Sequence, residues 1–342
     1  MGKRVVICCD GTWNSLKQPA TTNVVKIAQG VAKRDDQLVH YHEGVGTRPF
    51  ERVLGGAFGF GLSRNVRDAY RFLVEHYEPG DELFFFGFSR GAYTARSTVG
   101  FVRNCGILRR DEIGRVDEAY RLYRDSDPRT HPVATRAAEF RRAYACEEVT
   151  PVRFVGVWDT VGALGIPLSG FRFLNRRCQF HDTKLTGTVA AACQALAVDE
   201  RRGPFRPTIW ESDDAPHQLR EQTWFVGSHS DVGGGYPDPC LASISLLWMA
   251  ERARRSGLVF EPDAFAGLEV VEAPVHDSRT SFYKLLRAYE RQLGVVDPGH
   301  EEVAPEAVAR LGSDPSYAPR NLKEFLAKRA EGSGHVGAPG GA

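Results

Sequence analysis

The predicted fold depends on one stretch, Phe84-Phe85-Phe86-Gly87-Phe88-Ser89-Arg90-Gly91. Consecutive phenylalanines are typical of a strand buried on both faces, and the residues from Tyr93 to Cys105 have the pattern of a helix. The pentapeptide between them has the form G-x-S-x-G, which makes a sharp nucleophile turn when it joins a strand to a helix. Gly87 and Gly91 leave room for that turn. The stretch therefore predicts that Ser89 is a catalytic nucleophile.

Further apolar runs of strand length surround this turn. They are Arg4–Cys9, Gln37–His42, Val152–Trp158 and Thr223–Gly227, in addition to Glu82–Gly87. Helix-like stretches alternate with them: Asn65–Tyr77, Tyr93–Cys105 and Ile244–Arg255. This alternation predicts an α/β fold of the α/β-hydrolase type, with a mainly parallel sheet and helices on both faces. Ligands bind beyond the carboxyl ends of such strands, so catalytic residues are expected just after strands.

A serine nucleophile needs a base and an acid that orients the base, and in this fold they follow in the order Ser, acid, His. Asp159 ends the strand Val152–Trp158, and His229 follows the strand Thr223–Gly227. We predict these two residues as acid and base. The alternatives are Asp199 and Glu211 for the acid and His276 and His300 for the base.

The negative charge that develops on the substrate oxygen requires backbone donors. We expect one donor to be the N–H of Arg90 and the second to be the N–H of Gly11 or Thr12, after the first strand. Asp10 is expected to cap this turn or to hold Thr12 and Asn14, and to point away from the oxyanion.

Asp10, Asp159, His229 and Asp231 could instead form an oxygen-rich metal site, although no tight ligand motif is present. A metal-dependent hydrolase is therefore one alternative function. A non-catalytic binding module that keeps the hydrolase shell is another. The preferred interpretation, a serine esterase, requires neither a metal nor an organic cofactor.

The chain of 342 residues is expected to form a single domain over residues 1–326, followed by a disordered tail over 327–342. Insertions at about 44–64, 107–146 and 163–185 are expected to form a cap over the site. In the first of them, Phe58, Phe60 and Leu62 could line an acyl groove, touch a lipid surface or pack on the core.

Overall composition excludes some classes of function. The formal net charge is +1, from 44 basic and 43 acidic residues, which does not favour nucleic-acid binding. Seven cysteines occur without C-x-x-C spacing, which is typical of reduced thiols. No signal peptide is evident, and no apolar run approaches the ~20 residues that span a bilayer. We therefore expect a soluble, cytoplasmic protein, and secretion without a cleaved signal remains compatible with this.

Five motifs together resemble an uncharacterised α/β-hydrolase family, whose best-known members are the catalytic domains of type VI secretion phospholipase effectors. The motifs are Cys9–Asn14, Gly87–Arg96, Gly156–Gly162, Ala197–Arg201 and Gly227–Tyr236. The resemblance runs from about Arg4 to Leu326. It implies a Ser–Asp–His triad at Ser89, Asp159 and His229, and hydrolysis of esters, including phospholipid acyl esters, with transient contact with a membrane surface.

This sequence departs from the family's pattern at two points. Cys193 stands where the family often has a histidine. The chain also stops soon after the hydrolase core, whereas the secreted effectors carry further regions for membrane engagement or delivery. A stand-alone housekeeping enzyme is therefore an alternative to a secreted toxin.

Overall fold

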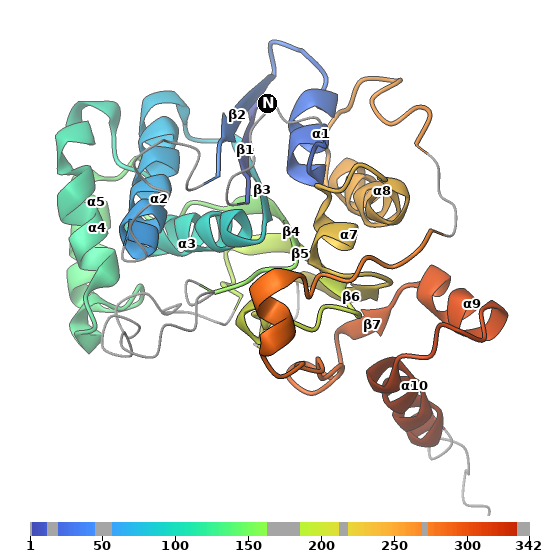
Figure 1. Ribbon diagram of the computed structural model, residues 1–342. Coiled ribbons are helices and arrows are strands. Elements are labelled where there is room, and N and C mark those ends of the chain that lie inside the picture. Colours follow the sequence, from blue (N-terminus) through green and yellow to red (C-terminus); the bar gives the residue numbers. More distant parts are fainter. Residues whose placement is uncertain are drawn as a thin grey trace, which may run out of the picture.

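The computed structural model describes residues 2–11, 20–44, 57–162, 185–211, 218–268 and 273–333. Within these segments, seven strands form one sheet in the order β2-β1-β3-β4-β5-β6-β7 (Figure 1), and all neighbouring strands are parallel. The strands are β1 (Arg4–Cys9), β2 (Gln37–His42), β3 (Glu82–Phe88), β4 (Val152–Trp158), β5 (Val189–Ala197), β6 (Leu219–Phe225) and β7 (Glu301–Val303). The predicted α/β fold with a parallel sheet is thereby confirmed.

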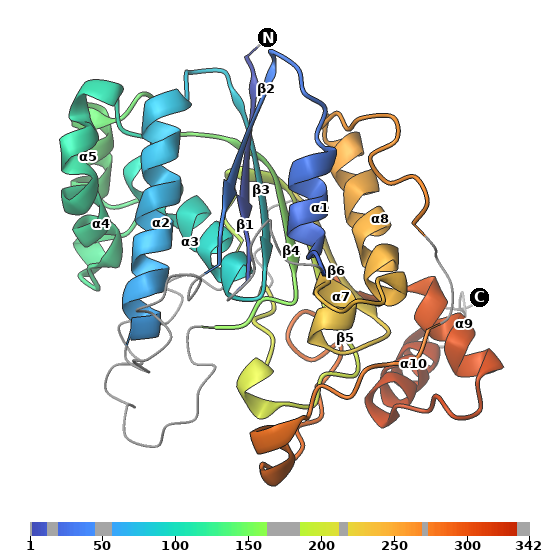
Figure 2. The ribbon, with the colours of Figure 1, turned by 45° about the horizontal axis from the view of Figure 1, so that its top comes forward.

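Helices cover both faces of the sheet (Figure 2). Those on one side are α2 (Ala57–His76), α3 (Arg90–Cys105), η1 (Arg110–Arg115), α4 (Val116–Arg124), η2 (Pro128–Thr130) and α5 (Thr135–Tyr144), and those on the other are α1 (Asn23–Gly30) and α8 (Cys240–Arg255). The remaining helices are η3 (Gly203–Phe205), α7 (His229–Gly233), η4 (Ser281–Leu285), α9 (Pro305–Ser313) and α10 (Arg320–Ser333).

The continuous apolar runs of β1 and β3 follow from this layering. Val5 and Ile7 of β1 pack in the same core as α2 and α3, whereas Val6 and Cys8 pack in the core of α1 and α8. In β3, Phe85 belongs to the first of these cores, and Phe84 and Phe86 belong to the second. A strand buried on both faces needs no polar positions, which explains why the sequence predicted it so readily.

The sequence analysis did not predict two strands of the sheet, β5 and β7. Strand β5 contains five alanines and only one β-branched residue, so it lacks the composition that usually marks a strand. It is nevertheless almost completely buried between β4 and β6. Strand β7 has three residues, too few for a recognisable pattern. Tertiary packing, rather than local preference, determines both strands.

The segments expected to form a cap differ in what the structure describes. Residues 107–146 contain η1, α4, η2 and α5 and lie beside the sheet, outside α2 and α3 (Figure 2), instead of across the strand ends. Residues 45–56 and 163–184 are outside the described residues. From Ala57 onward the first segment is already part of α2. Leu62 is buried, and the side chains of Phe58 and Phe60 are outside the description.

The C-terminal prediction requires a correction. A disordered tail was expected from residue 327, but α10 continues to Ser333. Its buried Leu322 and Phe325 belong to a third apolar core, together with Trp224 of β6 and Leu241 of α8. The Ala, Lys, Arg and Glu residues that follow are good helix formers, so the helix extends past its packed part. No helix in the described segments is long and apolar enough to cross a membrane.

Candidate active site

Ser89 occupies the turn between β3 and α3. Its backbone has φ 56° and ψ −120°, a conformation that L-residues rarely adopt. The serine is 6% exposed, and its N–H donates to the carbonyl of Trp158 at the end of β4, over 3.0 Å. Arg90 begins α3, so the N–H groups of the first helical turn point toward the end where Ser89 lies.

The two glycines of this turn are required by close backbone contacts. A Cβ atom on Gly87 would lie 2.6 Å from Cα of Ala92. A Cβ atom on Gly91 would lie 2.1 Å from the carbonyl oxygen of Cys9. The glycines therefore let α3 start directly against the end of β1, as the sequence pattern predicts for a nucleophile turn.

Asp159 and His229, the predicted acid and base, are in direct contact. Asp159 follows β4, His229 begins α7 after β6, and their Oδ2 and Nδ1 atoms are 2.5 Å apart. Asp159 is fully buried and His229 is 4% exposed. Among the described non-glycine residues, Ser89 and Asp159 alone have positive φ, 56° and 40°. Backbone strain of this kind clusters at functional sites.

The position of His229 is fixed from several sides. Its ring lies 4.6 Å from the ring of Phe88, the residue before Ser89, and 4.9 Å from the ring of Phe205. Its backbone N–H donates to Oε2 of the buried Glu200 over 3.2 Å. The contact with Phe88 brings the turn that carries His229 against the turn that carries Ser89.

Arg291 is part of this site, and the sequence analysis did not single it out. Its guanidinium is fully buried and donates to both oxygens of Asp159, from NH1 to Oδ1 over 2.5 Å and from NH2 to Oδ2 over 2.9 Å. Burial alone would favour the neutral acid, but the charge and hydrogen bonds of Arg291, together with His229, outweigh it and hold the pKa of Asp159 well below its ordinary value. In the sequence Arg291 is one arginine among many charged residues, without a motif around it.

One expected oxyanion donor is already engaged by another group. The N–H of Gly11 donates to Oδ1 of Asp10 over 2.6 Å, so the carboxylate caps its own turn. The other oxygen of Asp10 accepts from the hydroxyls of Thr22 and Tyr41, each over 2.7 Å. The expectation that Asp10 points away into its turn agrees with these contacts, and the choice of Gly11 as donor does not. Thr12 and Asn14 are outside the described residues.

The alternative acids and bases have other partners. Asp199 accepts hydrogen bonds from the N–H of Gly227 and the hydroxyl of Tyr317, and burial raises its pKa. Glu211 is exposed. His276 pairs with Asp231, with Nδ1 and Oδ1 2.6 Å apart, and His300 contacts Asp297 and Arg220. It is therefore Asp159 that contacts the predicted base.

The carboxylates of the alternative metal site are likewise held apart. Asp10 bonds to Thr22 and Tyr41, Asp159 to Arg291 and His229, and Asp231 to Ser228 and His276. Each carboxylate is thus satisfied by a different set of donors. Among the described residues, no group of three or more His, Cys, Asp or Glu side chains could hold a metal ion together.

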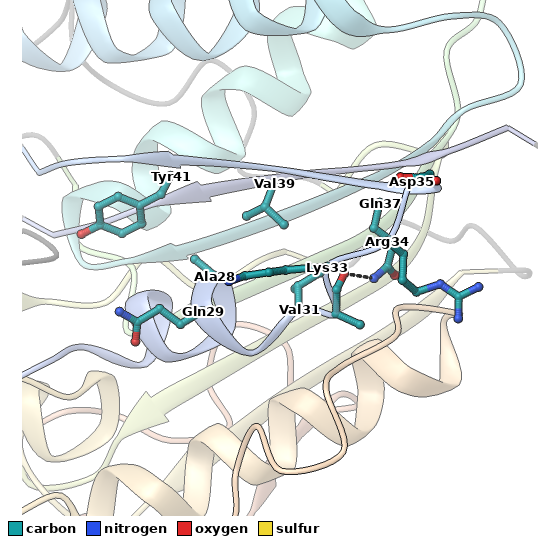
Figure 3. Close-up of a pocket in the computed structure, with 10 residues that line it drawn as sticks. Ala28, Gln29, Val31, Lys33, Arg34, Asp35, Gln37, Val39 and Tyr41 are labelled. Atoms are coloured by element: carbon teal, nitrogen blue, oxygen red, sulfur yellow. Dashed lines mark hydrogen bonds between the residues drawn. The ribbon is translucent and has the colours of Figure 1, made fainter.

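A separate hollow of about 710 Å³ runs along the edge strand β2 (Figure 3). Its lining comes from α1, the turn after it and β2, and Val39 faces Ala28 across it. Because β1 lies between β2 and β3 in the sheet, this hollow is distinct from the turn that carries Ser89. Tyr41 at its end connects it to Asp10 through the hydrogen bond described above.

The sequence matches a known protein family over most of its length. The model of the family described as the catalytic domain of Tle1-like phospholipase effectors of the type VI secretion system matches residues 3–252. The chain belongs to this Tle1-like family. Its catalytic-domain description supports a hydrolase of the lipase or phospholipase type. Cys193, the first of the two departures from the family's pattern described above, lies in the core within β5 and is fully buried, away from the strand ends.

The matches to individual proteins span only part of this chain and only part of each matched protein. The uncharacterized protein YEL023C of Saccharomyces cerevisiae is 30% identical over 227 residues, which are 60% of this chain and 32% of that protein. An uncharacterized protein from Pseudomonas aeruginosa has 16% identity and a TM-score of 0.46, over 79% of this chain and 49% of its own. The Tle1 effector bound to the VgrG spike has 21% identity and a TM-score of 0.39, over 69% and 52%. This chain thus spans about a third of the yeast protein and about half of the two solved chains.

Proposed function

We propose that this protein is a serine hydrolase of carboxylic esters, with Ser89 as nucleophile, His229 as base and Asp159 as the acid that orients the base. The observation that carries the proposal is the buried contact between Asp159 and His229, which lies against the strained turn of Ser89. A serine hydroxyl is a weak nucleophile until an adjacent base removes its proton, and His229 is the base in this proposal.

In the proposed mechanism, each nitrogen of His229 has its own role. An ionised carboxylate can only accept hydrogen bonds, so Nδ1 carries its hydrogen toward Asp159. Nε2 is then the acceptor for the Ser89 proton. Ser89 attacks the ester carbonyl, and His229 passes the proton to the departing alcohol. Water, activated in the same way, then releases the acyl group.

Stabilisation of the oxyanion is assigned to the amino end of α3. The N–H of Arg90 follows the nucleophile directly, and the dipole of this 16-residue helix favours negative charge at its first turn. Since Gly11 donates to Asp10, we propose Thr12, rather than Gly11, as the second donor. Family membership supports lipid esters, including phospholipids, as the substrate class.

The test is active-site labelling with a fluorophosphonate probe and turnover of a short p-nitrophenyl ester. Wild-type protein should be labelled, and Ser89→Ala should lose both labelling and turnover, because the nucleophile is gone. Ser97→Ala, a buried serine two turns further along α3, is the matched control and should keep both. Labelling that persists in Ser89→Ala would exclude Ser89 as the nucleophile. Turnover that requires a divalent ion and disappears with EDTA would favour the metal-dependent alternative.

The substrate class is tested separately. Release of fatty acid from phosphatidylcholine, phosphatidylglycerol and triacylglycerol is compared under the same conditions. Preference for the phospholipids would support a phospholipase, and hydrolysis restricted to short soluble esters would contradict it.

A further inference from the structure

We propose that Arg291 is a positioning residue of this site, which holds Asp159 in the orientation and ionised state that His229 requires and thereby extends activity toward low pH. This inference rests on the proposed function and assigns a role that the Ser–Asp–His arrangement alone does not contain.

The first argument is the geometry around the Asp159 carboxylate. Oδ1 accepts from Arg291 NH1 and from the N–H of Ala197, and Oδ2 faces His229 and Arg291 NH2. Both oxygens therefore have two partners, which leaves the carboxylate no other orientation of equal energy. A planar, two-pronged contact fixes rotation as well as distance, which a single point charge does not.

Arg291 also connects Asp159 to two backbone carbonyls near His229, those of Ala197 and Phe205. Its NH1 donates to the carbonyl of Ala197 at the end of β5, and its NH2 donates to the carbonyl of Phe205 in η3. The ring of Phe205 packs edge-on against the His229 ring. One guanidinium thus positions the acid and, through Phe205, one side of the base.

The second argument is the charge balance of the buried site. Asp159 is completely desolvated, and a buried carboxylate without a cation is pushed toward its neutral form. Arg291 supplies the compensating charge at contact distance. The other carboxylates nearby have partners of their own: Glu200 pairs with Arg202, and Asp231 on α7 contacts Nδ1 of His276. Arg90 of α3 interacts with Tyr283 of η4, and the ring of Tyr283 lies 6.0 Å from the ring of Phe205.

The sign of the pH effect follows from this balance. Arg291 stabilises the ionised form of Asp159, so the wild-type carboxylate stays charged as the pH falls. Without that cation, burial acts unopposed and the pKa of Asp159 rises. As the pH falls, the carboxylate then becomes protonated at a higher pH than in the wild type. An opposite charge at this distance typically changes a carboxyl pKa by about 1–3 units. The acid limb of the activity profile should therefore move toward higher pH.

The experiment compares Arg291→Lys and Arg291→Met with wild type by the pH dependence of p-nitrophenyl ester turnover and by the rate of fluorophosphonate labelling. For Arg291→Lys we expect kcat to fall about 10–100-fold, the range seen when a partner that orients a catalytic ligand is removed. KM should change little, because Arg291 touches no substrate. The acid limb should move upward in Arg291→Met and less in Arg291→Lys, which keeps the charge.

The chain contains a matched control in the Arg220–Asp297 pair. This ion pair is also almost fully buried, with Arg220 Nε 2.8 Å from Asp297 Oδ2, but it does not contact Asp159 or His229. Arg220→Lys should lower thermal stability without moving the acid limb. If folded Arg291→Lys behaves like Arg220→Lys, with kcat close to that of wild type, Arg291 is merely structural and the proposal is wrong. An acid limb that does not move in folded Arg291→Met would equally contradict it. Should Arg291→Met fail to fold, the Lys variant decides.

A readout that does not need turnover separates this inference from the proposed function. The hydrogen between His229 Nδ1 and Asp159 should give a far-downfield proton NMR signal that is absent in His229→Ala. Loss or a clear upfield shift of this signal in Arg291→Lys, but not in Arg220→Lys, would support the role of Arg291. An unchanged signal would overturn it. If wild type is neither labelled nor active, the proposed function fails, and the signal still reports on Arg291.

Discussion

At the scale of single residues, two aspartates near the strand ends have opposite electrostatic surroundings: Asp159 is fully buried and Asp199 is half-buried. Asp159 has a guanidinium on both oxygens, and its pKa is lowered. Asp199 receives hydrogen bonds from Gly227 and Tyr317, and burial raises its pKa. In the proposed acyl transfer, only a carboxylate that stays ionised could stabilise the positive charge on His229.

This contrast predicts different results for the two amide substitutions. Asp159→Asn should lower kcat of ester turnover by about 10⁴-fold, because the amide no longer orients the base or balances its charge. Asp199→Asn should retain kcat within about threefold, since this side chain contacts the chain around His229 without touching its ring. Steady-state kinetics on a soluble ester checks both. Near-normal turnover of Asp159→Asn would remove Asp159 from the proposed triad.

At the scale of elements, the nucleophile turn depends on how closely α3 approaches β1. Gly91 needs no positive φ in this turn, and it is required because the carbonyls of Cys9 and Asp10 lie where a Cβ would be. The same closeness places the amino end of α3 next to the backbone of Cys9 and Asp10, shortly before Thr12, the proposed second oxyanion donor. The glycine spacing in the sequence therefore reports a contact between two elements.

A substitution that adds one methyl group at Gly91 tests this contact. Gly91→Ala should lower the free energy of unfolding by about 1–3 kcal/mol, because backbone atoms must move to admit the Cβ, and it should reduce labelling of Ser89. Gly114→Ala in η1 is the matched control, since its Cβ would meet no atom within 4 Å. Urea unfolding and probe labelling of both variants provide the comparison. Equal stability of the two variants would contradict the steric argument.

At the scale of the whole molecule, the C-terminal region contacts the part of the sheet that carries Asp159 and His229. Tyr317 donates to Asp199 over 3.0 Å, and Asp199 accepts from Gly227, which begins the turn to His229. Asn321 of α10 donates to the carbonyl of Val198, just after β5. The C-terminal region is thus connected to the site through two short chains of contacts, one from Tyr317 before α10 and one from Asn321 in it.

Two truncations test this support. Removal of residues 315–342 deletes the buried side chains of Leu322 and Phe325, and each such burial stabilises a fold by about 1.5–3 kcal/mol. We expect a clear fall in the midpoint of thermal unfolding and loss of ester turnover. Removal of residues 334–342 leaves α10 complete and is the control, with both properties close to wild type. An unchanged midpoint after the longer truncation would show that α10 contributes nothing to the fold.

The sequence by itself predicted the parallel sheet and the turn of Ser89. Both predictions use local information, because apolar runs mark strands buried on two faces, and two glycines around a serine mark a tight strand-to-helix turn. The candidates Asp159 and His229 followed from chain order and from their places after strands. These patterns persist in the sequence because they reflect backbone geometry within about ten residues.

The tertiary structure alone decided which side chains meet. His229 lies 70 residues from its partner Asp159, and Arg291 lies 132 residues from the same carboxylate. Asp199 and Asp159 were equally permitted by the chain order, and the path of the loop before β7 brought Arg291 to Asp159. Likewise, the sequence allowed Gly11 as an oxyanion donor, but in the structure its N–H donates to the carboxylate of Asp10. Contacts of this kind depend on strand order and loop paths, which no local pattern encodes, so a single sequence leaves them open.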